Sequence, residues 1–252
     1  MSPGAISFIV LASVFGGAFA GMFLRRSLPQ DHLSADSKET VKVGMALVST
    51  MSALVLGLLV SSAKSFYDTQ SAELNQMSAD VVALDRLLAH YGPETKEARE
   101  TLRISVIRSL DRLWPQERPQ SSEAPLQPER SAEGLLDEIQ ALSPKDDKQR
   151  SLEAQALSMA VGIGRVRWLM YEQSNASFSR PLLLVMVFWL IAVFISFGLF
   201  APRNSTAIAS LFAAALAVSG AIFVILEMYM PFSGFIQISS APFRAALANL
   251  GH

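Results

Sequence analysis

Cysteine is absent from the sequence, and histidine and charged residues are scarce. Without cysteine, the chain of 252 residues has no disulfide, no catalytic thiol and no thiolate ligand for a metal. The three histidines, His32, His90 and His252, stand far apart and show no spacing typical of a metal site. We therefore expect neither a resident metal nor a cofactor.

Motifs of common enzymes and of nucleic-acid-binding proteins are also missing. The sequence has no phosphate-binding loop, no dinucleotide-binding glycine motif and no nucleophile elbow. Asp146-Asp147 is a weak calcium candidate, because such a site needs about six or more oxygens and acids at a helix start usually offset the dipole. The net charge of −1 provides no basic surface for nucleic acid. We expect a protein that is not an enzyme and does not bind nucleic acid.

Charged residues make up only 17% of the chain, below the roughly 25% of soluble domains, and the shortage is local. Four stretches carry no charge, namely 5–24, 43–60, 182–200 and 206–226. Each has about the length of a helix that crosses a bilayer. Ala18-Phe19-Ala20 resembles a signal-peptidase site, but no basic residue precedes the first stretch, so we favour a retained helix.

These stretches predict a division of the chain. Residues 1–64 are expected to hold transmembrane helices 1 and 2, and residues 181–227 transmembrane helices 3 and 4. Residues 65–180 are expected to form an extramembrane helical stalk domain, with an exposed linker at 115–131 that is rich in proline, serine and glutamine. Residues 228–252 form a tail. The predicted fold class is an all-α membrane protein surrounded by the lipid bilayer.

Small residues are expected to let membrane helices approach closely. Gly16, Gly17 and Gly21 give the first helix a face of small residues, and a second set, Ala209, Ala213, Ala217 and Gly220, lines one side of the fourth. Small residues at helical spacing are typical of contacts between membrane helices.

Heptad patterns predict the stalk. The first seam continues the second apolar stretch without an intervening proline, and it comprises Leu74, Met77, Val81, Leu84, Leu88 and Tyr91. The second seam comprises Leu152, Ala156, Met159, Ile163, Val166 and Met170. We expect the two seams to pair antiparallel; the alternative is that each packs against another element.

Shorter helices are expected between the seams. A stripe of Leu102, Val106, Leu110 and Leu113 predicts a helix over 94–114. The charges of this helix should mostly face away from that stripe; they are Glu97, Arg99, Glu100, Arg103 and Arg108. A short helix is expected over 132–142. Ser143 is the predicted N-cap of the second stalk helix.

The second apolar stretch also carries the pore-lining candidates. One face comprises Met45, Ser49, Ser52, Leu56 and Leu59. Serine hydroxyls can line an aqueous path, and leucines can form a hydrophobic constriction. The alternative is that the serines bond to their own helix backbone and pack against a neighbour. Four helices leave little room for a pore within one subunit, so conduction requires a ring of copies.

The tail carries a turn signal directly after the fourth apolar stretch. The candidate signature residues of the tail are Glu227, Pro231, Phe232 and Gly234. The apolar residues that follow are too few to span a bilayer, so we predict an interfacial or re-entrant segment. Phe232 and Phe235 are expected to be buried between the ends of membrane helices, while Glu227 faces polar atoms or water.

Several motifs resemble those of bestrophin-like bacterial membrane proteins, over most of the chain apart from the linker. They are Leu56-Gly57-Leu58-Leu59, Tyr67-Asp68, Arg86, Leu113-Trp114-Pro115, the tail from Leu226 to Ile236, Ser239, Pro242 and Arg244. The chain departs from the family pattern by lacking basic residues at Thr69 and Gln70, an acid at Gln76 and an Asp-Arg pair at Tyr229-Met230.

The resemblance implies a function and a location. Bestrophins proper are oligomeric anion channels whose second helix lines the pore, so we expect a homo-oligomeric ion channel in the bacterial inner membrane. A non-conducting scaffold or sensor that binds a protein partner through the stalk is the alternative. Orientation stays open, because lysine and arginine in the short loops favour termini and stalk outside, whereas the resemblance implies the reverse.

Overall fold

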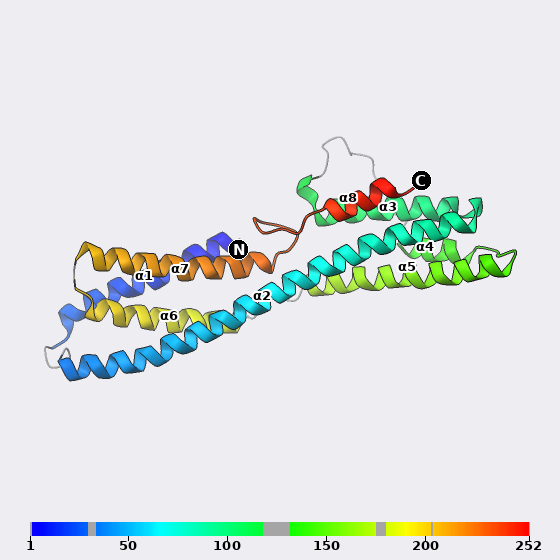
Figure 1. Ribbon diagram of the computed structural model, residues 1–252. Coiled ribbons are helices and arrows are strands. Elements are labelled where there is room, and N and C mark those ends of the chain that lie inside the picture. Colours follow the sequence, from blue (N-terminus) through cyan, green and yellow to red (C-terminus); the bar gives the residue numbers. More distant parts are fainter. Residues whose placement is uncertain (1, 30–33, 118–131, 175–179, 203, 252) are drawn as a thin grey trace. The chain divides into compact units, whose positions relative to one another are not determined.

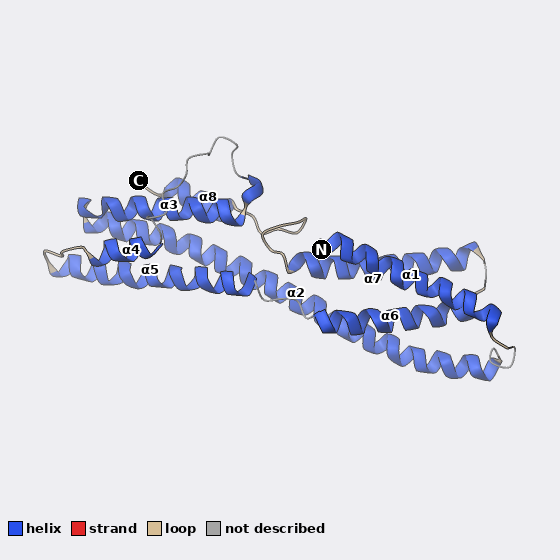
Figure 2. Ribbon diagram, turned by 180° about the vertical axis from the view of Figure 1, so that it is seen from behind, coloured by secondary structure: helices blue, strands red, loops and turns tan. Residues whose placement is uncertain are grey.

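The computed structural model describes residues 2–29, 34–117, 132–174, 180–202 and 204–251. Within these ranges the protein contains eight α-helices and no strand. Figure 1 shows the course of the chain through these helices, and Figure 2 colours them by type. They are α1 (Pro3–Ser27), α2 (Ala35–Tyr91), α3 (Lys96–Leu113), α4 (Ala132–Gln140), α5 (Asp147–Ser174), α6 (Arg180–Phe200), α7 (Ser205–Met228) and α8 (Ala241–Asn249). Most of the predicted linker, residues 118–131, lies outside the described residues.

Four of these helices are long and apolar enough to cross a membrane. They are α1, α2, α6 and α7, and they contain the four uncharged stretches. The all-helical class and the four candidate spans are thereby confirmed. The second of these helices is longer than its span requires, because it continues without a break for 57 residues.

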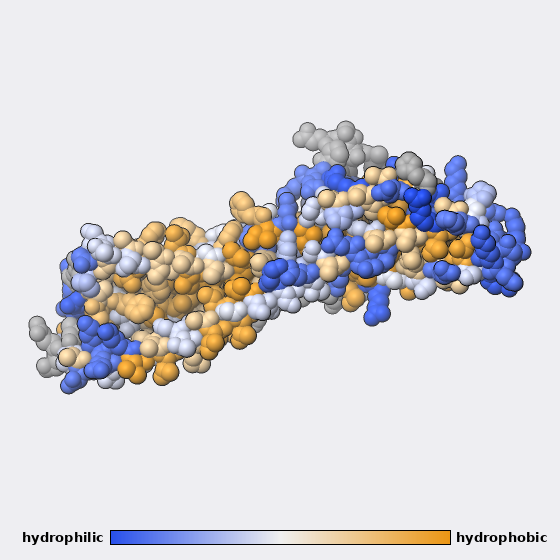
Figure 3. Space-filling model, viewed as in Figure 1, coloured by the Kyte–Doolittle hydropathy of each residue, from blue (hydrophilic) through white to orange (hydrophobic). Residues whose placement is uncertain are grey.

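The chain forms two units. The first comprises 1–67 and 177–230, and the second comprises 68–176 and 231–252, so α2 begins in the first and ends in the second. Figure 3 shows hydrophobic residues over most of the visible surface of the first unit and hydrophilic residues over much of the second. A surface of apolar side chains suits a lipid environment, and a charged surface suits water.

The first unit is built on close packing of α1 against α6. A Cβ atom placed on Gly21 would collide with the backbone of Ile195, and one placed on Gly198 would collide with the carbonyl group of Ala18. The predicted small face of α1 is therefore a contact at Gly17 and Gly21 but not at Gly16, where a Cβ atom would meet nothing within 4 Å. The partner helix contributes a glycine of its own. Val14, fully buried, lies in the same core.

Polar bonds hold α1 against α7 and fix one loop of the first unit. The Ser219 hydroxyl donates to the carbonyl oxygen of Ser7 at 2.5 Å. The Arg25 guanidinium donates to the carbonyl oxygen of Ala201 at 2.9 Å. Asn204 caps α7 by accepting the backbone N–H of Ala207 at 2.8 Å, which satisfies a donor that the helix itself leaves unpaired.

The second unit buries the first predicted seam. All six seam residues of α2 are buried, with Leu74, Leu84 and Leu88 fully enclosed. On α5, Ala156 and Met170 are buried and the other seam residues are half-buried. The side-chain amide of Gln149, near the start of α5, donates to the carbonyl oxygen of Tyr91 at 3.0 Å. Figure 1 shows α5 alongside the second part of α2.

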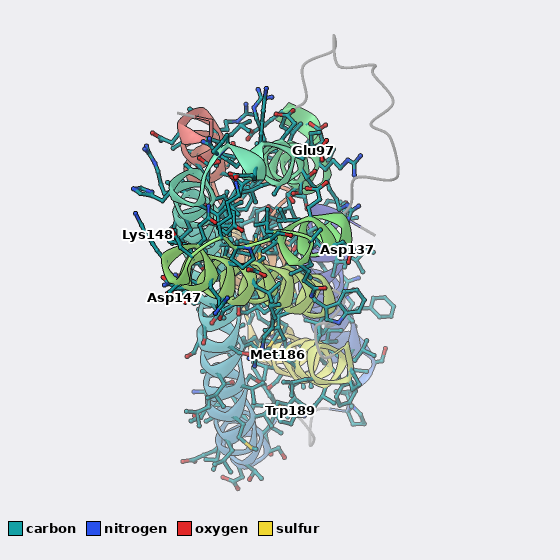
Figure 4. The ribbon with its side chains drawn as sticks, turned by 90° about the vertical axis from the view of Figure 1, so that its right-hand side faces the viewer. Glu97, Asp137, Asp147, Lys148, Met186 and Trp189 are labelled. Atoms are coloured by element: carbon teal, nitrogen blue, oxygen red, sulfur yellow. The ribbon has the colours of Figure 1, made fainter. Side chains whose placement is uncertain are left out.

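The shorter helices of the second unit pack as their apolar stripes predict. Leu102, Val106 and Leu110 of α3 are buried, and Leu113, the last residue of the predicted stripe, is half-buried. Glu97 of α3, Asp137 of α4, and Asp147 and Lys148 of α5 lie on the exterior of the unit (Figure 4).

The expected start of the second stalk helix is wrong by three residues, because Ser143 as the N-cap would place the first helical residue at 144. The helix α5 begins at Asp147, and the carboxylate of Asp146 accepts the backbone N–H of Gln149 at 2.7 Å. Ser143 lies outside the helix. A carboxylate at the start of a helix accepts the free N–H groups and also offsets the positive end of the dipole, so Asp146 takes the capping position.

Candidate functional site

The membrane segment of α2 is the uncharged stretch 43–60, and one of its faces packs toward the interior of the first unit. Ser52 and Leu59 are 4% and 5% exposed, and Leu59 belongs to the apolar core. The Ser49 hydroxyl donates to the carbonyl oxygen of Met45 at 2.8 Å. Ser52 donates in the same way to the carbonyl oxygen of Val48 at 2.7 Å. The packed face thus contains the pore-lining candidates Met45, Ser49, Ser52, Leu56 and Leu59, each buried or half-buried within one chain.

Most of the remaining residues of this segment are exposed, and they divide into two faces of different chemistry. The large outer face comprises Val43, Leu47, Leu54 and Leu58, which are 62–70% exposed. The small outer face comprises Ala46, Thr50, Ala53, Gly57 and Ser61, all exposed, and Lys64 extends it by one turn. The two faces follow from spacing, because residues three or four apart lie on one side of a helix.

The second helix is also the least covered of the four candidate spans. Only 11% of its most apolar window is buried, against 39% in α1, 33% in α6 and 28% in α7. Lipid can cover large aliphatic side chains, which are as apolar as acyl tails. A row of alanine, glycine and hydroxyl side chains gives lipid less to pack against, so the small outer face is suited to another helix or to water.

One end of the membrane segment is joined to the end of α7. The hydroxyl groups of Ser62 and Tyr229 lie 3.2 Å apart. The rings of Phe66 and Tyr229 stack with their centroids 5.2 Å apart. Tyr229 thus makes both an aromatic and a hydroxyl contact with α2. Glu227 is 3% exposed and therefore does not face water.

In the second unit, the tail closes around Trp114. This side chain is 2% exposed, and its indole N–H donates to the carbonyl oxygen of Ile238 at 2.8 Å. The ring meets Phe232 edge-on, with centroids 5.6 Å apart, and lies 6.4 Å from Phe243. An indole N–H inside a protein needs an acceptor, and the tail supplies it. The tryptophan-proline motif and the tail signature, remote in sequence, therefore form one cluster.

Charged groups hold the tail beside that cluster. Glu117 accepts a hydrogen bond from the Ser240 hydroxyl at 2.5 Å and from the Arg244 guanidinium at 2.9 Å. These bonds favour the ionised carboxylate and lower the pKa of Glu117, with the Ser240 bond contributing most. Pro231 is buried, and its carbonyl oxygen accepts the backbone N–H of Ile238 at 2.7 Å, which closes the turn.

A buried ion pair lies under the end of the tail. Asp85 is 1% exposed and accepts two parallel bonds from the Arg99 guanidinium, at 2.7 and 2.9 Å. The bond to Asp85 raises the pKa of Arg99. The backbone N–H of Gly251 also approaches the Asp85 carboxylate, at 3.4 Å. Most charges of α3 were expected to face away from its apolar stripe, and Arg99 departs from that pattern by binding Asp85. The sequence feature that could have indicated this ion pair is Asp85, an acid that directly follows the seam residue Leu84.

The predicted burial of Phe235 is also wrong. Its side chain is 88% exposed, whereas Phe232, three residues earlier, is half-buried against Trp114. Gly234 has a φ of 91°, a conformation that favours glycine, and it turns the chain between the two rings. Among the described residues, no group of three or more histidine, aspartate or glutamate side chains is arranged to hold a metal.

Comparison of the sequence with models of known families tests the family resemblance that the motifs indicated. The sequence model of the Bestrophin-like domain matches residues 12–243. The chain belongs to the bestrophin-like family. No curated protein and no solved structure matches it significantly. This bestrophin-like protein is a membrane protein, as its four candidate spans also indicate. The family match covers both the α2 segment and the Trp114 cluster.

Proposed function

We propose that this bestrophin-like protein is a homo-oligomeric anion channel in which α2 borders the central axis. The observation that carries the proposal is the uneven surface of the α2 membrane segment. Its large outer face suits lipid, and its small outer face suits an aqueous path or a neighbouring copy. Membership of a family related to oligomeric channels supports the same assignment.

The burial pattern shifts the proposed lining away from the predicted residues. Ser52 and Leu59 already pack inside one chain, so they would have to leave the core to face an axis. Thr50, Ala53 and Gly57 need no such movement because they are exposed. We therefore assign the lining to the small outer face, with Thr50 and Ser61 as its hydroxyl-bearing positions.

The anion preference rests on the charge at the end of that face. Lys64 lies one turn beyond Ser61, and a ring of lysines around a pore attracts anions and repels cations. Asp68 follows one turn later, and its negative charge opposes the field of Lys64. The ratio of chloride to sodium permeability measures which of the two charges dominates. We expect Lys64→Gln to lower the ratio of chloride to sodium permeability.

Assembly into a ring is supported by a second uncovered face. Ala209, Ala213, Ala217 and Gly220 of α7 are exposed, and a Cβ atom on Gly220 would meet nothing within 4 Å. Small side chains let helices from two copies approach closely. We propose that this face contacts a second copy. We further propose that α2 and α5 pair antiparallel as an extramembrane stalk, which the Gln149–Tyr91 bond supports.

Anion flux from liposomes tests the function directly. The purified protein is reconstituted, its oligomeric state is measured by cross-linking in the same liposomes, and chloride release is followed. Channel activity requires release that depends on the oligomer. A verified oligomer without flux, in liposomes that contain both orientations, contradicts the proposal. Fractionation of a bacterial host tests the accompanying assignment to the inner membrane.

A scaffold or sensor is the second candidate, and exposed apolar residues on α5 favour it. Val161, Trp168 and Leu169 are 53%, 66% and 39% exposed in the second unit. Such residues suit a protein partner at the stalk. This function predicts a protein that co-purifies with the wild type and is lost in Trp168→Glu, together with the absence of flux.

A further inference from the structure

The loop between α7 and α8 displays an aromatic side chain to its surroundings. Phe235 is 88% exposed, the highest value among the large hydrophobic side chains of the described residues. Even the lipid-exposed positions of α2 do not exceed 70%. A phenylalanine ring has about 150–250 Å² of surface to bury, and here it buries almost none of it.

This exposure is a fixed property of the loop. The hydrogen bond from the Ile238 N–H to the Pro231 carbonyl oxygen, at 2.7 Å, closes residues 231–238 into one turn. The indole N–H of Trp114 binds the carbonyl oxygen of Ile238 at 2.8 Å, and Phe232 packs on the same ring. Gly234, with its φ of 91°, then directs the chain outward immediately before Phe235.

Chain length keeps the loop near the end of a membrane helix. The helix α7 ends at Met228, and the loop begins three residues later at Pro231. Three residues span at most about 10 Å, and the headgroup region on each side of the hydrocarbon is roughly 5–8 Å thick. The loop therefore stands within reach of the lipid headgroups.

We propose that the 231–238 loop is a membrane-surface contact, in which Phe235 inserts among the headgroups and upper acyl chains of the bilayer. Aromatic side chains are enriched at this depth of a membrane. The Trp114 cluster holds the turn, and the bilayer supplies apolar surroundings for the exposed part of the Phe235 ring. The contact would tie the tail to the membrane surface. It does not depend on whether the protein conducts ions.

Spin labelling in liposomes tests the contact, and the absence of cysteine makes each label unique. Phe235→Cys is the test position, and Gln237→Cys is the matched control because Gln237 is exposed on the same loop. Each full-length variant carries a nitroxide and is reconstituted in phosphatidylcholine vesicles. Power saturation then compares collision with oxygen, which concentrates in the bilayer, and with a water-soluble nickel chelate.

Lipid insertion predicts frequent collision with oxygen and rare collision with nickel at position 235, with a lower oxygen-to-nickel ratio at 237. Frequent nickel collision at both positions overturns the proposal, because the loop then lies in water. Rare collision with both reagents at 235 also overturns it, because the ring is then covered by protein, as it would be in a contact with a second copy. Both variants must elute from gel filtration as the wild type does.

Discussion

Removal of Arg99 should destabilise the second unit far more than removal of a nearby surface arginine. Arg99 forms two bonds to Asp85, whose side chain is 1% exposed, while Arg99 itself is 23% exposed. Arg99→Gln leaves a buried carboxylate without its cation. Breaking a buried ion pair costs about 3–5 kcal/mol, and water that reaches the outer side of Arg99 should reduce this to about 2–3 kcal/mol.

The matched control is Arg103 on the same helix. Its contact with Glu100 is 3.7 Å long, and both side chains are about half exposed, at 50% and 49%. An exposed pair contributes about 0–1 kcal/mol, so Arg103→Gln should be nearly silent. Charge, helix and substitution are the same in both variants, and burial of the acidic partner is the main difference.

Thermal unfolding in detergent, followed by circular dichroism, measures the difference. A loss of 1 kcal/mol lowers the Tm of a chain of this size by about 2–4 °C, so Arg99→Gln should lower it by about 5–10 °C. Asp85→Asn combined with Arg99→Gln should recover part of the loss, because no buried charge remains. Equal small shifts for Arg99→Gln and Arg103→Gln would refute the buried-pair account.

Three further outcomes follow from the packing. Leu84→Asp should cost several kcal/mol because it buries an unpaired charge in the seam, whereas Glu97→Asp on the exterior should leave the Tm unchanged; similar losses for both would argue against the seam. The lowered pKa of Glu117 means that its contribution to tail docking is complete above about pH 4.5 and is lost as pH falls through the lower, folded-state pKa. Hydrogen exchange of the tail should therefore speed up in acid, and Glu117→Gln should abolish that pH dependence; an unaltered pH response in the variant would exclude Glu117. Gly198→Ala should push α6 away from Ala18 and cost about 1–3 kcal/mol in thermal stability, and a neutral result would mean that the helices are not in close contact.

Local properties of the chain allowed much of the fold to be predicted. Span length and lack of charge identify four membrane helices without reference to any contact, because each property belongs to a single segment. The seam from Leu74 to Tyr91 could also be predicted, because its heptad spacing is a property of a single helix. Gly17 and Gly21 indicated a close approach on α1, but not that Gly198 of α6 would provide the matching surface.

The remaining features depend on contacts between distant segments. The three-and-four spacing of α2 is compatible with several faces, and only tertiary packing decides that Ser52 turns inward and Thr50 outward. Trp114 and Ile238 are separated by 124 positions, so no local pattern predicts their bond. Burial of Phe235 between the ends of membrane helices was expected because the chain turns at 231–234 and too few apolar residues follow to span a bilayer, but the side chain is exposed.

Cysteine accessibility during anion flux tests most directly whether the small outer face of α2 borders the conducting axis. Thr50→Cys, Leu54→Cys and Ser52→Cys place single thiols on the small, large and packed faces of the same helix. A negatively charged methanethiosulfonate reagent modifies a thiol that water reaches. The account predicts that the reagent blocks chloride flux through Thr50→Cys and leaves the other two variants conducting. Block of Ser52→Cys with no effect on Thr50→Cys would contradict it.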